Sequence, residues 1–251
     1  MTKLAGTNIL VIGGTSGIGN AVASLALAEG ANVQISSSKA SRVESAVADL
    51  RTAHPSATVA GHVVDLSNED TLEDNVAGLL AAVGPLNHIV FTAGDSLPVY
   101  ELKDITPALY HKAHTVRVVA PLMVAKHAAK ILPPSPRSSI TLTTGSIASK
   151  PIPNWTVVSS LAAAAQGVTR NLAVDMKPIR VNIVAPGVVY TPLWDSWPKE
   201  VVETMLEQAK AKTTTGETGK VEDVAEAYLY LMKDSNVSGV NIDTNSGVFL
   251  V

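Results

Sequence analysis

Cysteine is absent from this chain of 251 residues, and charged residues make up only 16% of it. Without cysteine there is no disulfide framework, no thiolate nucleophile and no cysteine metal site, so nothing requires an oxidising compartment. The net charge is −3, and Lys and Arg are scattered rather than clustered. The charge pattern therefore gives no case for binding nucleic acid or an anionic membrane surface.

Long hydrophobic runs are also missing. The first apolar run, N-I-L-V-I, breaks at Gly13-Gly14 and is too short for the apolar region of a signal peptide. No later run approaches the length of a membrane span. We therefore expect a soluble, cytoplasmic protein with no membrane partner.

A set of metal ligands is not evident either. His111 and His114 stand three residues apart on an expected helix, but no third ligand accompanies them. Catalytic zinc generally needs three protein ligands. We expect no metal site.

The last absence is local. No side chain between Lys150 and Arg170 titrates near neutrality, in a stretch that begins P-I-P-N-W-T-V-V-S-S-L-A-A-A-A-Q-G. This segment therefore supplies neither a general acid nor a general base.

Hydrophobic residues, by contrast, make up 46% of the chain and follow a regular pattern. Short β-branched runs alternate with longer Ala- and Leu-rich stretches, which is typical of βαβ units in one doubly wound, Rossmann-like α/β domain spanning residues 1–251. The expected strands are Thr7–Ile12, Asn32–Ser36, Thr58–Val64, His88–Thr92, Ser138–Thr143, Arg180–Ala185 and Gly239–Asp243. The expected helices are Gly17–Glu29, Ala40–Ala53, Glu69–Val83, Thr106–Leu132, Thr156–Met176 and Val221–Met232.

The glycine-rich stretch I-L-V-I-G-G-T-S-G-I-G carries the strongest chemical signal, because a strand leads through it directly into a helix. Gly13 permits the tight turn, Gly17 lets the backbone approach a pyrophosphate, and Gly19 allows the helix to pack on the sheet. The helix N-terminus then offers N–H groups to the phosphates. We predict a dinucleotide site that includes Thr15, Ser16 and Ile18 of the same loop.

The end of the second strand favours NADP(H). An NAD site would place a carboxylate here for the ribose hydroxyls, but the chain reads Q-I-S-S-S-K-A-S-R. Hydroxyls and basic groups suit the 2′-phosphate instead, and the candidates are Ser36, Ser37, Ser38, Lys39 and Arg42. A polar turn that caps the next helix is the alternative. Asp65 is a candidate partner of the adenine amino group, or else a helix cap.

Four motifs together resemble the short-chain dehydrogenase/reductase family over nearly the whole chain. They are G-G-T-S-G-I-G, D-L at Asp65-Leu66, T-A-G at Thr92-Ala93-Gly94, and R-V-N-I-V-A-P-G-V-V-Y-T from Arg180 to Thr191. The resemblance implies that the T-A-G residues line the ribose next to the nicotinamide. It also implies that the nicotinamide is flanked by Pro186, Gly187, Val188 and Thr191.

The catalytic positions depart from the family pattern. Family members use an Asn-Ser-Tyr-Lys tetrad, in which Tyr exchanges a proton with the substrate oxygen and Lys lowers the Tyr pKa. The matching positions here read Arg117, Thr144, Val157 and Leu161. Neither Val nor Leu can protonate the oxygen of a reduced ketone, and a guanidinium is a poor proton donor. Ordinary carbonyl reduction by the family mechanism is therefore not expected.

A narrower resemblance adds a candidate activity. Arg117, the P-x-P-x-W sequence ending at Trp155 and the missing Tyr-x-x-x-Lys resemble the fungal reductase/Diels-Alderases of malbrancheamide and paraherquamide biosynthesis. Those enzymes reduce a cyclic iminium-type intermediate with NADPH and guide an intramolecular cycloaddition. Their P-D-P-G-W has an Asp paired to the Arg, whereas this chain has Ile152 and Asn154 at the Asp and Gly positions.

Three functions remain open on the sequence. The first is a biosynthetic enzyme that acts on a cyclic nitrogen-containing secondary metabolite by iminium reduction, cycloaddition or both. The second is a non-redox cyclase or isomerase that keeps bound NADP⁺, and the third is a nucleotide-binding regulator. For the enzyme, Arg117 would bring positive charge, Thr144 a hydrogen bond and Trp155 a hydrophobic wall. Asp95 or Glu101 is a hypothetical replacement for the missing carboxylate.

Aromatic residues are scarce, at 4% of the chain, yet several gather after the P-G-V-V-Y-T motif. We expect at least one of these rings to contact a small-molecule substrate, with Trp155 as the best candidate; packing without substrate contact is the alternative. The candidates are Trp155, Tyr190, Trp194 and Trp197. The resemblance implies that residues 188–220, here named the covering segment, fold over the substrate.

Apolar faces on two expected helices point to self-association. The stretches Thr106–Leu132 and Thr156–Met176 are alanine-rich and apolar over much of their circumference. In the family these two helices commonly form a dimer interface. We expect a homodimer or homotetramer.

Overall fold

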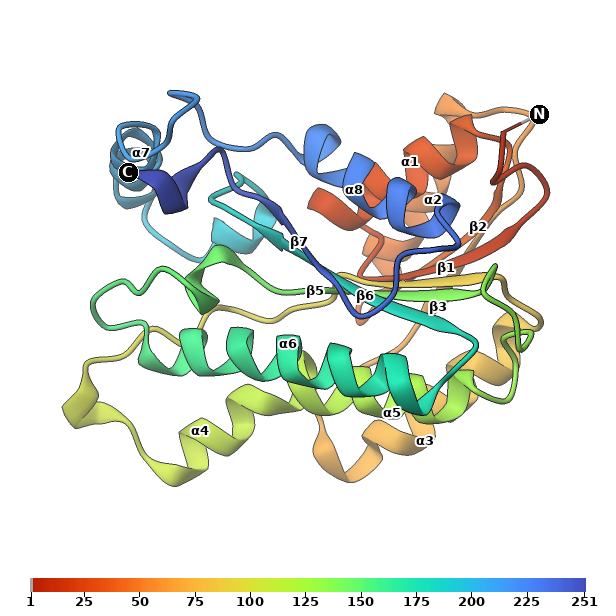
Figure 1. The fold of residues 1–251 in the computed structure, drawn as a ribbon, viewed down its shortest axis with the longest axis horizontal. Coiled ribbons are helices and arrows are strands. Elements are labelled where there is room, and N and C mark those ends of the chain that lie inside the picture. Colours follow the sequence, from red (N-terminus) through yellow and green to blue (C-terminus); the bar gives the residue numbers. More distant parts are fainter. Residues whose placement is uncertain (1) are drawn as a thin grey trace.

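A parallel sheet crosses the computed structural model, which describes residues 2–251. Within these residues the sheet has seven strands in the order β3-β2-β1-β4-β5-β6-β7 (Figure 1). The strands are β1 (Asn8–Ile12), β2 (Asn32–Ser37), β3 (Val59–Val63), β4 (His88–Phe91), β5 (Ser139–Thr143), β6 (Arg180–Pro186) and β7 (Asn241–Thr244). The order reverses between β1 and β4, which is the topological switch point where ligands bind in open α/β sheets.

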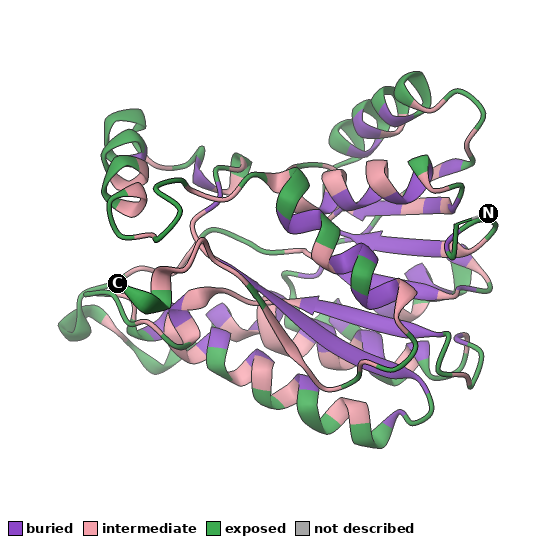
Figure 2. Cartoon of the chain, turned by 45° about the horizontal axis from the view of Figure 1, so that its top comes forward, coloured by how far each residue is buried: buried purple, intermediate pink, exposed green. Residues whose placement is uncertain are grey.

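Helices cover both faces of the sheet. One face carries α1 (Gly17–Ala28), α2 (Ala40–Ala53) and α8 (Val221–Lys233), and the other carries α3 (Glu69–Val83), α4 (Pro107–His114), α5 (Ala120–Ala128) and α6 (Thr156–Asp175) (Figure 1). Each face buries its own apolar cluster against the strands. β4 and β6 are buried along their whole length, which explains their continuous apolar sequence (Figure 2).

The predicted fold is confirmed, and every expected strand forms within a few residues of its predicted bounds. One helix is wrong: the predicted Thr106–Leu132 helix divides into α4, a π-helical turn at Thr115–Val119, and α5. Pro107 sits in the first turn of α4, where the missing N–H costs nothing. Pro121 directly follows the π turn in a backbone that stays helical through Val119, and its missing N–H interrupts the regular α-helical hydrogen bonds there. The periodic pattern continued through the π turn and therefore hid it.

The carboxyl ends of the strands gather the loops that matter for function. In Figure 1 this edge lies on the left, together with the segment before α4, helix α7 (Lys199–Lys210) and the C-terminus. The covering segment leaves the sheet after β6 and returns at a parallel bridge between Val189 and Gly219. Helix α7, which was not expected from the sequence, lies within this segment, and Val202 is its one buried residue.

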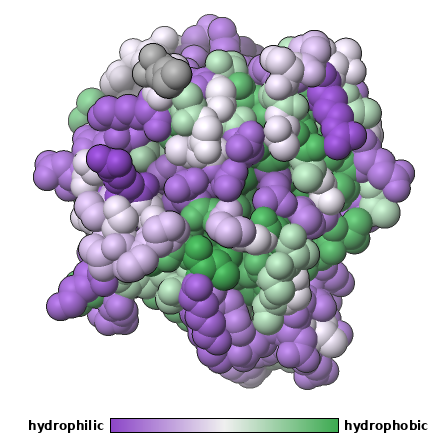
Figure 3. All heavy atoms as spheres, turned by 90° about the vertical axis from the view of Figure 1, so that its right-hand side faces the viewer, coloured by the Kyte–Doolittle hydropathy of each residue, from purple (hydrophilic) through white to green (hydrophobic). Residues whose placement is uncertain are grey.

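The opposite end of the molecule carries the amino ends of the strands and the connections that lead into them. Figure 3 shows hydrophilic side chains over much of this end, with apolar residues between them. Across residues 2–251, every helix is too short or too polar to span a bilayer.

Candidate active site

The glycine-rich loop between β1 and α1 is fastened to the neighbouring strands. The N–H groups of Gly13 and Gly14 donate to the carbonyl oxygen of Ser36, at 2.9 and 3.3 Å. Gly13 has a φ of +88°, and a Cβ at this position would lie 2.5 Å from the backbone nitrogen of Ala93. The hydroxyl of Thr92 donates to the carbonyl of Gly13 at 3.2 Å. Only glycine can stand at position 13, because the loop after β1 passes so close to the backbone after β4.

Gly17 and Gly19 leave room at the start of α1. Gly17 has a φ of +54°, and a Cβ there would lie 3.1 Å from the side chain of Thr191. A Cβ at Gly19 would lie 2.3 Å from the Thr92 hydroxyl oxygen. The first turn of α1 holds no acidic residue, and its N-cap Ser16 makes no side-chain capping bond. The N–H groups of this turn are therefore free for an anion, which fits the pyrophosphate of a dinucleotide.

The predicted ligands of the 2′-phosphate, at and after the end of β2, differ in how far they are buried. Ser37 is half-buried, whereas Ser38, Lys39 and Arg42 are exposed at the start of α2. Ser36 is fully buried, so its hydroxyl does not reach the surface where a phosphate would bind. Its carbonyl accepts from the glycine loop. A contact of Ser36 with the 2′-phosphate stays a prediction, and its burial favours the exposed candidates.

Asp65 shapes the turn after β3. Its Oδ1 accepts from the N–H of Ser67 at 2.9 Å and from the Ser67 hydroxyl at 2.7 Å. These hydrogen bonds lower the pKa of Asp65. The side chain remains exposed, while Leu66 is buried in the core, so Leu66 offers a ligand only its main chain.

The P-G-V-V-Y-T motif brings β6 back to the glycine loop. Gly187 donates its N–H to Thr244 at 3.0 Å, and a Cβ on Gly187 would lie 2.9 Å from Cα of Asn245. The carbonyl of Val188 accepts from the N–H of Gly219 at 3.0 Å. These contacts direct Thr191 toward Gly17, so two predicted cofactor motifs far apart in the sequence meet.

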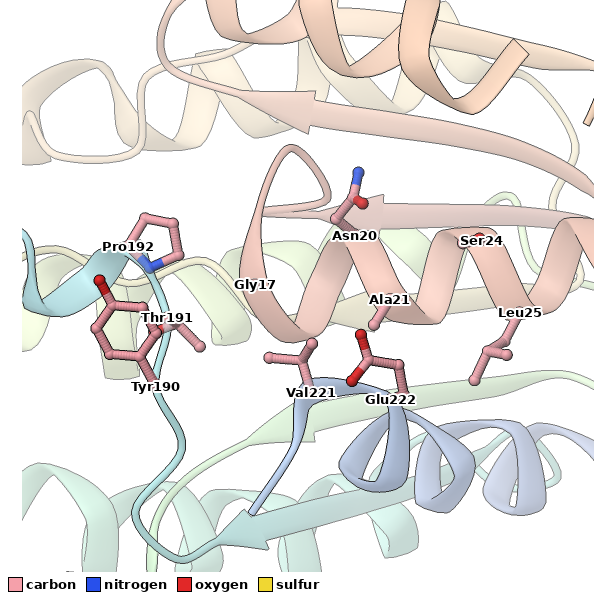
Figure 4. Close-up of a pocket in the computed structure, with 10 residues that line it drawn as sticks. All are labelled: Gly17, Asn20, Ala21, Ser24, Leu25, Tyr190, Thr191, Pro192, Val221 and Glu222. Atoms are coloured by element: carbon pink, nitrogen blue, oxygen red, sulfur yellow. The ribbon is translucent and has the colours of Figure 1, made fainter. Parts of the chain in front are cut away.

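A pocket of about 370 Å³ opens beside this meeting point. In Figure 4 Tyr190, Thr191 and Pro192 stand at one end of it, opposite the residues of α1, and Glu222 lies at the start of α8. Tyr190 is 58% exposed and belongs to this pocket.

Of the positions predicted to match the family tetrad, two hold buried apolar side chains and one holds a hydroxyl that already donates a hydrogen bond. Val157 and Leu161 are both buried and pack together with Ala113. The hydroxyl of Thr144 donates to the carbonyl of Ala162 in α6 at 2.9 Å. In this arrangement Thr144 can accept a hydrogen bond from a substrate but has no free proton to donate.

Tyr228, in α8, forms a hydrogen bond to a residue of β5. It is fully buried on the α8 side and shares a 2.7 Å hydrogen bond with the Thr143 hydroxyl. Burial raises the pKa of Tyr228 well above its ordinary value. It therefore does not replace the missing tyrosine acid.

Arg117 lies at the centre of the π-helical turn, a type of segment often found at functional sites. Its guanidinium rests on Gly94, where a Cβ would lie 2.9 Å from both Nη1 and Nη2. Nε donates to Oδ1 of Asp95 at 3.1 Å, and Nη2 donates to the Asp95 carbonyl. Burial lowers the pKa of Arg117, and the charge and hydrogen bond of Asp95 oppose that change. Arg117 thus has a carboxylate partner, while Glu101 pairs with Lys103.

The P-I-P-N-W segment forms a turn that depends on residue 154. Asn154 has a φ of +68°, a conformation that Gly adopts freely and Asn more readily than most residues. The carbonyl of Asn154 accepts from the N–H of Tyr100 at 3.2 Å. Asn can therefore stand where the P-D-P-G-W pattern has Gly, and Trp155 keeps its place at the start of α6. Ile152 is 47% exposed.

Three tryptophans form one cluster. The ring centroids of Trp155 and Trp194 are 6.5 Å apart, and those of Trp194 and Trp197 are 5.4 Å apart. Trp194 is buried and donates its Nε1–H to the Val189 carbonyl at 2.9 Å. Trp194 therefore anchors the covering segment, and Trp155 and Trp197, each half-buried, keep surface for a ligand. Tyr190 lies apart from this cluster.

Comparison with known proteins agrees with this geometry. A family model described as an SDR-like Rossmann domain matches residues 1–251. The chain belongs to the short-chain dehydrogenase/reductase family. It is 44% identical to the family member fsr5 of Gibberella fujikuroi, covering 100% of this chain and 97% of that one. It is 41% identical to malC of Malbranchea aurantiaca, covering 98% and 96%.

Solved structures of family members superpose closely. The MalC reductase/Diels-Alderase from Malbranchea aurantiaca matches with a TM-score of 0.94 at 40% identity, covering 99% of this chain and 98% of that one. A small-chain dehydrogenase in complex with NADPH matches with a TM-score of 0.81 at 27% identity, covering 98% and 100%.

Sequence reasoning missed one contact beside the site. Lys150, directly before P-I-P-N-W, donates to the carbonyl oxygens of Val248, at 2.5 Å, and of Val251. Thr214 of the covering segment donates through its N–H to the Ser246 carbonyl at 3.0 Å. The stretch 246–251 thus joins the covering segment to the P-I-P-N-W turn. No sequence motif signals main-chain acceptors of this kind.

Proposed function

We propose that this protein is an NADP(H)-dependent biosynthetic reductase that acts on a cyclic nitrogen-containing metabolite by reducing an iminium-type carbon. One observation carries the proposal: Val157 and Leu161, at the positions of the family's acid pair, are buried apolar residues. An iminium carbon that accepts a hydride becomes a neutral amine, because the C=N electrons return to nitrogen as a lone pair. That reaction needs no proton donor, whereas ketone reduction does.

The residues of the chain fit the dinucleotide. NADPH, when bound, supplies the hydride. The loop from Gly13 to Gly19 leaves no space for added Cβ atoms, and the uncapped start of α1 suits the pyrophosphate. Exposed Ser38, Lys39 and Arg42 suit the 2′-phosphate. A similar structure, that of a small-chain dehydrogenase in complex with NADPH, supports the same cofactor.

The remaining site residues would shape and orient the substrate. Trp155 offers a planar hydrophobic face, and Trp155, Leu97 and Val99 pack against the same apolar cluster of Ile147, Val158 and Ala162. Arg117 lies against Gly94, next to the expected ribose position, with its charge balanced by Asp95. In this proposal the covering segment closes the site from the other side.

An intramolecular cycloaddition is the second candidate activity. It is favoured by the similarity to MalC, which is named a reductase/Diels-Alderase and matches with a TM-score of 0.94. A cycloaddition moves no proton to or from the protein, so a site bordered by the first turns of α6, which hold no titratable group, suits it equally well. Proximity and orientation would supply most of its rate enhancement.

Incubation with cyclic iminium and azadiene precursors tests the proposal. Each precursor is combined with NADPH, with NADP⁺ or with no cofactor, and both the product and the absorbance of the reduced cofactor are followed. The proposal expects amine formation only with NADPH, matched by cofactor oxidation. Product that forms equally with NADP⁺ would identify a non-redox cyclase, and nucleotide binding without any turnover would identify a regulator.

A further inference from the structure

In the ion pair of Asp95 and Arg117, the carboxylate is more exposed to solvent than the guanidinium. The Asp95 side chain is 43% exposed and the Arg117 side chain 22%. The guanidinium is directed at Gly94 and at both the carboxylate and the carbonyl of Asp95. A ligand that approaches from the exposed side therefore meets the negative end of the pair first.

One carboxylate oxygen of Asp95 remains available. Oδ1 accepts from Arg117, and within residues 2–251 Oδ2 has no hydrogen-bond donor. Two hydrogen bonds from one guanidinium, to the side chain and to the main chain, restrict how the carboxylate can turn. The oxygen is thus held in place rather than free to rotate.

The loop that carries Asp95 also holds apolar residues and a second acid. Leu97 and Val99 follow Asp95 in the chain and pack against the apolar cluster that includes Trp155. The Asp95 carboxylate is 43% exposed, so a charge–charge contact here has the strength of a pair near the protein surface, which is still stronger than one in bulk water. The other acid of this loop, Glu101, is already paired with Lys103 at 2.8 Å, and both are well exposed.

We propose that Asp95 is a substrate-recognition residue that selects a positively charged nitrogen compound, a cyclic iminium or ammonium ion, over a neutral compound of the same shape. Arg117 is then a positioning residue that fixes Asp95. This inference rests on the proposed function, because it names the charge of the substrate that the same site takes.

The test measures binding, not turnover. A quaternary cyclic iminium salt, N-methyl-dihydroisoquinolinium, and its neutral lactam, N-methyl-dihydroisoquinolone, are titrated by calorimetry into the cofactor-free protein and into the protein saturated with NADP⁺. We expect the native protein to bind the cation at least about tenfold more tightly than the lactam. Asp95→Asn should bind both probes equally, with its affinity for the lactam unchanged.

Glu101→Gln is the matched control, because it removes an acid from the same loop and should leave the preference for the cation intact. The proposal is overturned if Asp95→Asn keeps the preference, if Glu101→Gln abolishes it, or if a folded Asp95→Asn loses both probes alike. The dependence of the cation preference on salt concentration tests the proposal without a variant. In the native protein the preference should shrink between about 0.05 M and about 0.5 M NaCl, and a constant preference would contradict a charge contact.

Failure of the inference and failure of the proposed function give different results. NADPH oxidation by the native protein with the same iminium salt reports on the proposed function alone. A selective cation site without cofactor oxidation would refute the reductase, while oxidation of NADPH with equal binding of both probes would refute the role of Asp95.

Discussion

Two regions of this protein follow the family pattern to very different degrees: the expected cofactor site around β1, β2 and β4, and the expected catalytic site around α6. Around β1, β2 and β4 the contacts are made by main chain and by the lack of side chains, as at Gly13 and Gly19. Around α6 the family's chemistry depends on side chains, and here those positions hold Val157 and Leu161. On our proposal, a scaffold defined by backbone geometry is kept while apolar residues stand at the positions of its acid chemistry.

The difference also shows where a new function can arise. Substitution at the glycine loop breaks packing between strands, so little can change there. Substitution in the first turns of α6 changes side chains rather than backbone contacts, and its cost depends on the size and charge of the residue placed among Val157, Leu161 and Ala113. Asp95 and Arg117 lie between the two regions, since Arg117 rests on Gly94 of the T-A-G motif.

The largest effect should come from a charge placed back at position 161. Leu161 is 2% exposed and packs with Val157, so Leu161→Lys should cost about 3–5 kcal/mol of folding free energy. Val174→Lys, on the same helix at 63% exposure, should change stability by less than about 0.5 kcal/mol. Urea unfolding measures both. Equal stability of the two variants would mean that position 161 opens into a solvated pocket able to accept the family lysine.

A smaller loss should follow Gly13→Ala. The added Cβ would overlap the backbone of Ala93 at 2.5 Å, so we expect a cost of about 3 kcal/mol and no measurable NADPH binding. Gly6→Ala is the control, because Gly6 has a similar φ of +74° with no atom within 4 Å of the new Cβ. It should cost about 1 kcal/mol and leave NADPH binding unchanged. If the two variants behave alike, backbone strain rather than the close approach of β4 explains the glycine.

The smallest effect concerns the 2′-phosphate. Lys39 is exposed at the end of β2, and Lys39→Ala should weaken NADPH binding about tenfold while leaving NADH binding unchanged. Lys130→Ala, an exposed lysine just after α5, should affect neither. Cofactor fluorescence titration provides the four affinities. Equal weakening of NADPH and NADH would show that Lys39 does not contact the phosphate.

The sequence predicted the sheet and the glycine loop well, because both are encoded by local patterns: apolar runs for buried strands and glycines where a Cβ would collide. The loss of the Tyr-x-x-x-Lys pair was inferred from the family resemblance and stays a prediction. The π turn around Arg117 was not predictable, since its apolar spacing differs little from that of an α-helix.

Side-chain partners were harder still. Asp95 was only one of two candidate acids in the sequence, and three-dimensional packing decides that it, rather than Glu101, pairs with Arg117. The burial of Ser36 and Trp194 likewise depends on neighbours distant in the chain. Asn154 could have been anticipated, because the family pattern has Gly there and Asn shares its tolerance of positive φ.

The central claim is that this site passes a hydride to a carbon that needs no protonation. The most direct measurement uses NADPH deuterated at the transferred position, with a cyclic iminium salt and the ketone of the same ring system offered in parallel, and follows the label by mass spectrometry. The account predicts deuterium at the former iminium carbon and no reduction of the ketone above the uncatalysed rate. Reduction of the ketone at a rate comparable to that of the iminium, with deuterium in the alcohol, would contradict it.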